Sequence, residues 1–369
     1  MAQPAISVEA LQGLLAHSQP VTVLDIRRAD ERAEWSIPGS MHVDVYDALN
    51  ANRPNALATL NLPTDRPVVT ICGAGKTSLL AAEQLRARGF DAHSLTGGMK
   101  GWSLAWNQAE VALPGSKARV VQVRRTGKGC LSYLIGADRT AAVVDPALEP
   151  DVYLGLARQN GWTITHIFET HVHADHLSRG RVLAERSGAT HHLPEQKRVV
   201  YPFAPIQDGQ EIGIGPARLA ALRTPGHTPE STCYLLDGQA LFTGDTLFLA
   251  GVGRPDLEAT PDEARRRAHL LYRSLWRLLA LPAQTIVLPG HASEPIAFDG
   301  VALAGPLAQV KAQVALLHMP EERFVESILA RIPATPPNHQ RIVEFNEAGL
   351  LPQGDLTDWE AGANRCAIA

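Results

Sequence analysis

The sequence predicts two α/β domains followed by a helical segment. Its 369 residues are more than one compact core usually organises. Apolar strands that lead into glycine-containing loops and helical patterns occur over about residues 21–95 and again beyond residue 120. Between these regions, residues 107–119 are polar and contain Pro114-Gly115, which is typical of a domain boundary.

Composition restricts the classes of partner and compartment. The chain is 45% hydrophobic and 20% charged, a balance typical of globular proteins, and its net charge of −4 provides no broad basic field. We therefore expect neither nucleic acid nor a membrane as partner, and no apolar run approaches the length of a membrane span. The N-terminus lacks the pattern of a secretory signal, and the four cysteines are scattered. A reducing cytoplasm is the expected location.

The first domain is predicted to carry a reactive cysteine. Strands over 21–25 and 67–71 lead into loops, and the second is followed by the segment Cys72-Gly73-Ala74-Gly75-Lys76-Thr77-Ser78 and a helix over 79–88. Backbone N–H groups of such a turn and the positive end of a helix dipole lower a thiol pKa and hold anions. The alternative is a buried structural cysteine in a turn.

Three ordered motifs give residues 5–107 a resemblance to the rhodanese family. They are Asp25-Ile26-Arg27 with Glu31, Ile37-Pro38-Gly39-Ser40, and the segment from Leu95 to Trp102. The resemblance implies that Cys72 carries a persulfide. Many family members have an arginine where this chain has Thr77, so we expect a thiol-borne persulfide rather than thiosulfate as donor, with Lys76 as a weaker anion-binding group. An inactive docking domain is the alternative.

The second domain contains a cluster of metal-binding residue types. Strands are predicted over 120–123, 130–135 and 141–145, then a helix over 150–160 and a buried strand over 162–168. The loop that follows reads Thr170-His171-Val172-His173-Ala174-Asp175-His176. Three imidazoles and a carboxylate this close are costly to bury without a cation. A metal site is therefore expected on this loop.

Further candidate ligands lie at the ends of later apolar runs. His227 follows Thr224-Pro225-Gly226, Asp245 follows Thr243-Gly244, and His291 follows Pro289-Gly290. Each stands at a glycine or proline turn, where side chains from separate segments can converge. One such match would be weak, but four in this order, with the H-x-H-x-D-H motif first, are a specific signal.

This order over residues 118–300 resembles the metallo-β-lactamase superfamily. The resemblance implies an αββα sandwich with its site at one edge of two sheets. The candidate ligands are His171, His173, Asp175, His176, His227, Asp245 and His291. Two zinc ions would imply hydrolysis, as in a glyoxalase II, whereas one iron held by two imidazoles and a carboxylate would leave positions for dioxygen and substrate. The ligand set alone does not distinguish them.

Two features favour iron. The segments 244–248 and 251–257 look like those of persulfide dioxygenases, and a sulfur-transfer domain is fused to the same chain. By that resemblance one Fe(II) is held by His171, His227 and Asp245, and the outer groups that orient ligands and substrate are His173, Asp175, His176 and His291. The implied reaction oxidises the sulfane sulfur of a glutathione persulfide-like thiol with O2 to sulfite. Arg254 either binds a carboxylate of the carrier or fixes its loop through Asp256.

The remaining chain is predicted to be helical. Thr260-Pro261-Asp262-Glu263 begins a helix that runs to about Ala280, and further helical patterns follow. The expected organisation is an α/β rhodanese-like domain (1–110), a linker (111–119), an αββα metallo-β-lactamase domain (120–300) and a helical C-terminal extension (301–369). We expect a homo-oligomer. Two other functions stay open: a dinuclear zinc thioester hydrolase and a non-catalytic sulfur-binding protein.

Overall fold

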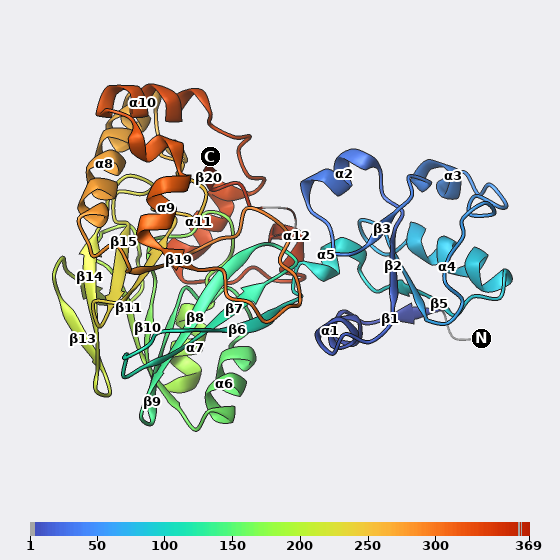
Figure 1. The fold of residues 1–369 in the computed structure, drawn as a ribbon, viewed down its shortest axis with the longest axis horizontal. Coiled ribbons are helices and arrows are strands. Elements are labelled where there is room, and N and C mark those ends of the chain that lie inside the picture. The colour runs from blue at the N-terminus through green and yellow to red at the C-terminus, as the bar shows by residue number, and fades with distance from the viewer. Residues whose placement is uncertain (1–3, 361, 363) are drawn as a thin grey trace.

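The computed structural model describes residues 4–360, 362 and 364–369. It contains the two α/β domains and the helical extension that the sequence predicts (Figure 1). In Figure 1 the first domain lies on the right, and the larger second domain lies on the left. The fold class predicted from sequence is confirmed.

The first domain is a five-stranded parallel sheet with helices around it. Its strand order is β1-β5-β4-β2-β3. The central strands are fully buried and rich in β-branched residues, as expected for a parallel sheet that is covered on both faces. The elements are β1 Ala5–Ile6, α1 Val8–Ala16, β2 Thr22–Asp25, α2 Ala29–Glu34, β3 Met41–His42, α3 Tyr46–Asn50, β4 Val68–Ile71, α4 Thr77–Ala87, β5 Ala92–Leu95 and α5 Gly98–Trp102.

The second domain has two sheets packed face to face. The seven-stranded sheet has the order β12-β11-β10-β9-β8-β7-β6 and the six-stranded sheet β13-β14-β15-β16-β18-β19. The first sheet consists of β6 Asn107–Val111, β7 Arg119–Arg125, β8 Cys130–Ala137, β9 Thr140–Val144, β10 Thr163–Phe168, β11 Thr190–Pro194 and β12 Ala204–Ile206. The second consists of β13 Glu211–Ile214, β14 Ala217–Arg223, β15 Thr232–Leu236, β16 Ala240–Gly244, β18 Ile286–Pro289 and β19 Gly305–Pro306.

Apolar side chains from both sheets form the core between them. Phe168 and Ile135 from the first sheet share one buried cluster with Tyr234, Phe242 and Leu288 from the second. Helices α6 Pro150–Gln159 and α7 Gly180–Ser187 cover the outer face of the first sheet, and α8 Pro261–Leu279 covers the second. These are the four layers of an αββα sandwich.

The boundary predicted between the domains is wrong by about one strand. Residues 107–110 were expected to end the first domain and 111–119 to form a linker, yet 107–111 form β6, which pairs antiparallel with β7. Ala109 and Val111 are buried, while Gln108 and Glu110 face solvent. This alternation is typical of an edge strand with one face exposed to solvent. The exposed polar residues give the segment the composition of a linker.

The C-terminal extension packs against its own domain. Its elements are α9 Leu307–Gln313, a 3-10 helix Ala315–His318, α10 Glu321–Ala330, α11 His339–Ala348, α12 Thr357–Glu360 and β20 Ala367–Ile368. The rings of Phe324 on α10 and Tyr272 on α8 have centroids 5.4 Å apart. Strand β20 pairs with β17 Val252–Gly253, and α12 lies beside α5 at the junction of the domains (Figure 1).

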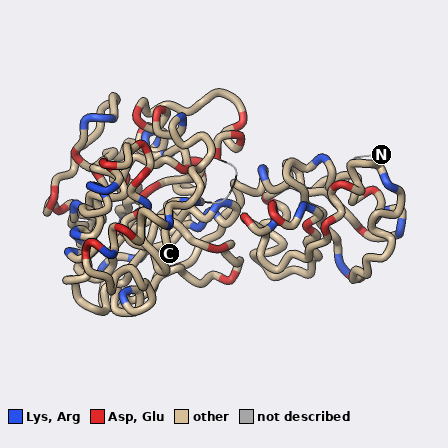
Figure 2. The backbone as a smooth tube through the Cα atoms, turned by 90° about the horizontal axis from the view of Figure 1, so that it is seen from above, with Lys and Arg blue, Asp and Glu red and all other residues tan. Residues whose placement is uncertain are grey.

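Charged residues of both signs are interspersed along both domains (Figure 2). The Nζ of Lys100 in the first domain contacts an Asp355 carboxylate oxygen of the extension at 3.0 Å. In the same junction, Trp35 Nε1 donates a hydrogen bond to the Thr126 carbonyl at 3.0 Å. None of the helices in the described residues combines the length and apolarity that crossing a bilayer requires.

Candidate metal centre

Three predicted ligands converge at the edge of the two sheets. His171 lies after β10, His227 after β14, and Asp245 directly after β16. Oδ2 of Asp245 lies 3.9 Å from Nε2 of His171 and 3.6 Å from Nε2 of His227. All three side chains are buried. The strand ends therefore bring two imidazoles and one carboxylate around a common point, which we call the triad.

The triad atoms fit a metal ion. Among the described residues, Nε2 of His171 and Oδ2 of Asp245 are buried and have no hydrogen-bond partner. Unpaired buried polar atoms are costly, and a cation would satisfy both. Burial, together with the neighbouring His173, holds the pKa of His171 well below its usual range. The imidazole is therefore neutral near pH 7 and offers a lone pair.

Hydrogen bonds orient the two imidazoles. Nδ1 of His227 donates to the Arg254 carbonyl at 2.7 Å, which leaves Nε2 free. Nδ1 of His171 lies 2.9 Å from the Thr170 hydroxyl, which donates to Asp145 Oδ2 at 2.8 Å. Asp145 has a φ of 50°, an uncommon value for a residue other than glycine. A partner on Nδ1 is what fixes the tautomer of a metal-binding histidine.

Nε2 of His173 is engaged by two carboxylates outside the triad. Its Nε2 lies 3.2 Å from Asp145 Oδ1 and 3.2 Å from Glu169 Oε2. Burial alone would lower the pKa of His173, but these two carboxylates raise it well above its usual range. The protonated form of the ring is therefore favoured, and its Nε2 is engaged by the two carboxylates rather than by the triad.

A second cluster lies beside the triad and contains a thiol. It comprises Cys130, Asp175, His176 and His291, whose ligand atoms all lie within 4.8 Å of one another. Nε2 of His291 contacts Asp175 Oδ2 at 2.9 Å, and its Nδ1 contacts Asp245 Oδ1 at 2.6 Å. Burial and Asp175 oppose ionisation of Cys130, but His176 and His291 outweigh them and lower its pKa to about 6. Asp245 and His291 thus join the two groups.

The C-terminal extension supports the H-x-H-x-D-H loop. Nδ2 of Asn346 on α11 donates to the carbonyls of His173 at 2.8 Å and His176 at 2.9 Å, and its Oδ1 accepts from Ser178 N at 2.8 Å. One side chain therefore satisfies three backbone groups of a loop that has no regular secondary structure.

Glu360 of α12 makes a second support. Its carboxylate accepts from Arg125 Nη2 at 2.9 Å, from Arg179 Nη1 at 3.0 Å and from the backbone N–H of Leu177 at 2.7 Å. Burial opposes ionisation of Glu360, but the two guanidinium groups lower its pKa to about 2. The extension is thus tied electrostatically to the segment that follows His176.

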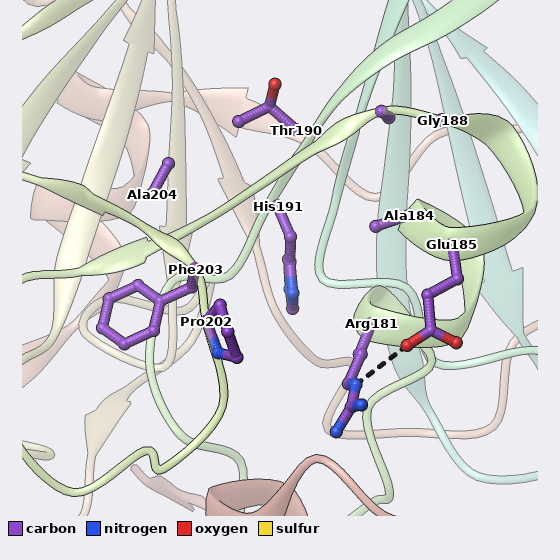
Figure 3. A pocket seen from close by; sticks show the side chains of 10 residues that line it. Arg181, Ala184, Glu185, Gly188, Thr190, His191, Pro202, Phe203 and Ala204 are labelled. Carbon is purple, nitrogen blue, oxygen red and sulfur yellow. Dashed lines mark hydrogen bonds and ion pairs between the residues drawn. The ribbon is translucent and has the colours of Figure 1, made fainter.

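Two cavities are candidates for a substrate site. One, of about 340 Å³, is lined by His291, Ala292 and Arg124. The other, of about 610 Å³, lies between α7 and β11, with Arg181, Glu185 and His191 on its wall (Figure 3). None of the triad ligands lines either cavity, but the smaller one is lined by His291, whose ring contacts Asp245 of the triad. The smaller cavity is therefore the better candidate for substrate.

The Arg254 guanidinium is paired within the protein. The guanidinium is fully buried, donates to both carboxylate oxygens of Asp256 at 2.8 and 2.7 Å, and donates to the carbonyls of Ala334 and Arg365 at 3.2 Å. These contacts use the side chain to fix its own loop and the C-terminal tail. They correspond to the predicted role in which Arg254 fixes its loop through Asp256.

The Cys72 thiol lies in a tight loop before α4. Its Sγ accepts from the Gly75 N–H at 3.1 Å and lies 3.3 Å from the Ser78 hydroxyl. A Cβ on Gly98 would stand 2.3 Å from the Cys72 carbonyl, so only glycine allows α5 to approach this loop so closely. Lys76 is exposed, and Thr77 is buried with its hydroxyl donating to Asn50 Oδ1 at 2.8 Å.

Sequence reasoning missed several of these groups. Cys130, Cys366, Asn346 and Glu360 contact the centre or its loop from distant parts of the chain, and no local motif marks them. Asp145 had a weak signal, since it ends a strand just before a proline.

Comparisons with known proteins agree with this architecture. Residues 125–291 match the family model described as the metallo-beta-lactamase superfamily, and residues 7–105 match the rhodanese-like domain. Among solved structures, ETHE1 from Myxococcus xanthus is 30% identical with a TM-score of 0.53, covering 66% of this chain and 99% of that chain. A metallo-beta-lactamase from Staphylococcus aureus is 28% identical with a TM-score of 0.58, covering 64% and 74%.

Curated relatives are hydroxyacylglutathione hydrolases. The Brucella anthropi protein is 32% identical over 210 residues, which cover 54% of this chain and 75% of the relative. The Rhodospirillum rubrum protein is 38% identical over 170 residues, or 43% of this chain, and the match spans only 60% of that relative's length. With the two-sheet fold and the ligands at its edge, these matches show that the chain belongs to the metallo-beta-lactamase superfamily and carries a rhodanese-like domain before it.

Proposed function

We propose that this protein is an iron-dependent persulfide dioxygenase that acts on a small thiol persulfide. The overall reaction is RSSH + O2 + H2O → RSH + H2SO3, in which the sulfane sulfur is oxidised and dioxygen is reduced. The carrier thiol leaves unchanged. Glutathione is the carrier we would test first, because the curated relatives are named for a glutathione thioester.

One observation carries the proposal: the ligand set at Asp245 has three members. His171, His227 and Asp245 share one group, and the fourth candidate, His173, is held instead by Asp145 and Glu169. Two imidazoles and one carboxylate with positions left open is the arrangement typical of non-haem Fe(II) oxygenases. Iron bound there would supply the redox chemistry that zinc lacks.

The surrounding residues would perform the other tasks. Thr170 and Asp145 orient the His171 ring, and burial of the triad excludes bulk water. His291 contacts Asp245 Oδ1 through Nδ1 and Asp175 Oδ2 through Nε2, and it also lines the cavity of about 340 Å³. Its ring thus holds protons at both nitrogens beside the space where a persulfide would lie.

Cys72 would carry sulfane sulfur in the first domain. Its Sγ lies in the loop before α4 and accepts a backbone N–H from Gly75 at 3.1 Å. Transfer at Cys72 and oxidation at the triad would then act on the same sulfur pool.

A dinuclear zinc thioester hydrolase is the second candidate, and the Cys130 cluster favours it. Asp175, His176 and His291 lie beside the triad and share Asp245 with it, so they offer ligands for a second ion. The names of the curated relatives match this alternative. Two bridged zinc ions would activate water rather than dioxygen.

Dioxygen uptake distinguishes the candidates. Protein loaded with Fe(II) should consume dioxygen and form sulfite when glutathione persulfide is added, and zinc-loaded protein should do neither. Absence of uptake by fully iron-loaded protein, together with oxygen-independent hydrolysis of a glutathione thioester, would overturn the proposal in favour of the hydrolase.

A further inference from the structure

The wall of the larger cavity contains a buried histidine. His191 on β11 lines the cavity of about 610 Å³ and is 8% exposed (Figure 3). Its Nε2 lies 3.3 Å from Glu169 Oε1, and its Nδ1 is buried without a hydrogen-bond partner among the described residues. A carboxylate oxygen accepts hydrogen bonds, so the imidazole donates its Nε2 proton to Glu169. His191 therefore connects the cavity wall to the residue two positions before the triad ligand His171.

Three side chains hold the Glu169 carboxylate. The Ser178 hydroxyl donates to Oε1 at 2.5 Å, alongside Nε2 of His191, and Nε2 of His173 lies 3.2 Å from Oε2. The Glu169 carbonyl accepts from the Tyr234 hydroxyl at 2.8 Å, which fixes the backbone at the same residue. The two oxygens of one buried carboxylate thus have different partners, His191 at one and His173 at the other.

His173 lies against a ligand of the metal. The centroid of its ring is 4.2 Å from that of His171 and 4.2 Å from that of His176. Its Nε2 is 3.2 Å from Asp145 Oδ1 and 3.2 Å from Glu169 Oε2. If the Glu169 carboxylate moved, the His173 ring would lose one of the two contacts that fix its broad χ2 rotation. The ring of His171, which packs against it, would then be free to shift.

Gly180, the first residue of α7, gives this arrangement its space. A Cβ at position 180 would stand 2.1 Å from Glu169 Oε1 and 2.6 Å from Nε2 of His191. Both distances are far shorter than van der Waals contact, so any larger residue would displace the carboxylate or the imidazole. Glycine within a helix is less stable than alanine by roughly 0.5–1 kcal/mol, a cost that the close approach explains.

We propose that His191 is a positioning residue of the metal centre. Through its hydrogen bond to Glu169, it fixes the carboxylate that orients His173 against His171. It acts through these residues and is not itself a ligand. The inference goes beyond the proposed function, because it requires only an ion at the triad and holds for iron or zinc.

The neighbouring histidine provides a matched control. His192 is 5% exposed and follows His191 on the same strand, so its side chain points to the opposite face of the sheet. Its Nε2 lies 3.0 Å from His166 Nδ1, and its ring stacks on Phe168 with centroids 4.7 Å apart. The two buried histidines therefore differ in the contact with the Glu169 carboxylate.

Cobalt spectroscopy and metal affinity test the assignment. In the Co(II)-loaded full chain, His191→Leu should shift the visible d–d bands. It should also lower the affinity for Zn(II) by about tenfold, the lower end of the range that outer contacts contribute. His191→Gln, which keeps a side-chain N–H donor, should recover most of both properties, and His192→Leu should match wild type. A wild-type spectrum and affinity in His191→Leu, equal changes in His192→Leu, or no recovery in His191→Gln would overturn the proposal.

A second variant disturbs the same contact without changing either partner. Gly180→Ala should raise the helix propensity of α7 and therefore fold, yet its Cβ should displace the Glu169 carboxylate. We expect shifted Co(II) bands and weaker Zn(II) binding, as in His191→Leu. The control is Gly155→Ala in α6, where a Cβ would meet only the end of the Arg158 side chain at 4.0 Å.

Unchanged metal binding and an unchanged cobalt spectrum in Gly180→Ala would contradict the proposal, as would equal changes in Gly155→Ala. Both readouts are independent of whether the iron-loaded protein consumes dioxygen, so failure of this inference and failure of the proposed function can be told apart.

Discussion

The Cys72 loop and the metal centre are built in opposite ways. The Cys72 site comes from one continuous stretch, in which Gly75 and Ser78 contact the thiol of a residue only a few positions earlier. The metal centre collects His171, His227 and Asp245 from three strand ends. It then depends on residues near the C-terminus, Asn346 and Glu360, for the support of its first loop.

This difference determines how sensitive each site is to mutation. A contiguous loop keeps its geometry as long as its own strand and helix are formed. A dispersed centre requires that several segments stay docked, so distant substitutions can disturb it. The two sites should therefore respond separately to mutation, and changes at Asn346 or Glu360, which support the loop of the metal centre, should affect that centre more than the Cys72 loop.

Replacing a triad ligand should have the largest effect. His171→Ala removes one of three ligands, so metal affinity should fall by more than the roughly 10–100-fold that outer contacts typically contribute. Dioxygen uptake should disappear, while sulfur transfer by Cys72 stays intact. The metal content after dialysis measures the loss of affinity, and the amount of sulfite formed measures the loss of dioxygenase activity. The exposed His318→Ala is the control; equal metal loss in both variants would contradict the assignment.

Cys72→Ser should produce the reverse pattern. The serine hydroxyl cannot carry sulfane sulfur, so transfer to cyanide or sulfite should fall to background. Dioxygen uptake with glutathione persulfide should stay within about twofold of wild type, because the triad is held by other segments. Parallel assays of sulfur transfer to cyanide and of dioxygen uptake measure the two activities in the same preparation. Loss of both activities would show that the sites do not work separately.

Glu360→Gln should weaken the docking of the extension. The change leaves Arg125 buried without its anion and leaves Arg179 with Glu149 alone; breaking a buried pair typically costs about 3–5 kcal/mol. Because the pKa of Glu360 is lowered to about 2 in the folded protein, its contribution is present above the unfolded pKa of about 4.5 and is lost as pH falls toward 2.

Urea unfolding at about pH 7 and about pH 3 tests this dependence. The difference between wild type and Glu360→Gln should be large at the higher pH and should shrink at the lower one. Glu344→Gln, whose carboxylate is exposed in its pair with Arg341, should behave like wild type. A difference that does not change with pH would contradict a charged, buried Glu360.

Asn346→Ala should have the smallest effect of the four. It leaves two loop carbonyls and one N–H without their partner, a cost of about 1–3 kcal/mol. Metal affinity should fall by at most roughly 10–100-fold, with Cys72 transfer unchanged. Isothermal titration with Zn(II) measures the affinity, and the exposed Gln340→Ala on the same helix is the control. If both variants bind metal equally, Asn346 does not hold the loop in solution.

The contrast between a contiguous loop and a dispersed centre also explains which features the sequence could predict. The Cys72 loop and the H-x-H-x-D-H loop are short, ordered motifs, so their residues could be named and placed at strand ends. Cys366 and Asn346 could not, because their partners lie far away in the sequence and a single cysteine or asparagine carries no local pattern. The strand at 107–111 was missed since its outward polar residues conceal its buried half.

The most direct test of the central claim is elemental analysis of the purified full chain. We expect about one iron ion per chain, lost in His171→Ala and retained in His318→Ala. About two zinc ions per chain, with little iron, would contradict the triad as a site for dioxygen chemistry and would assign the centre to hydrolysis.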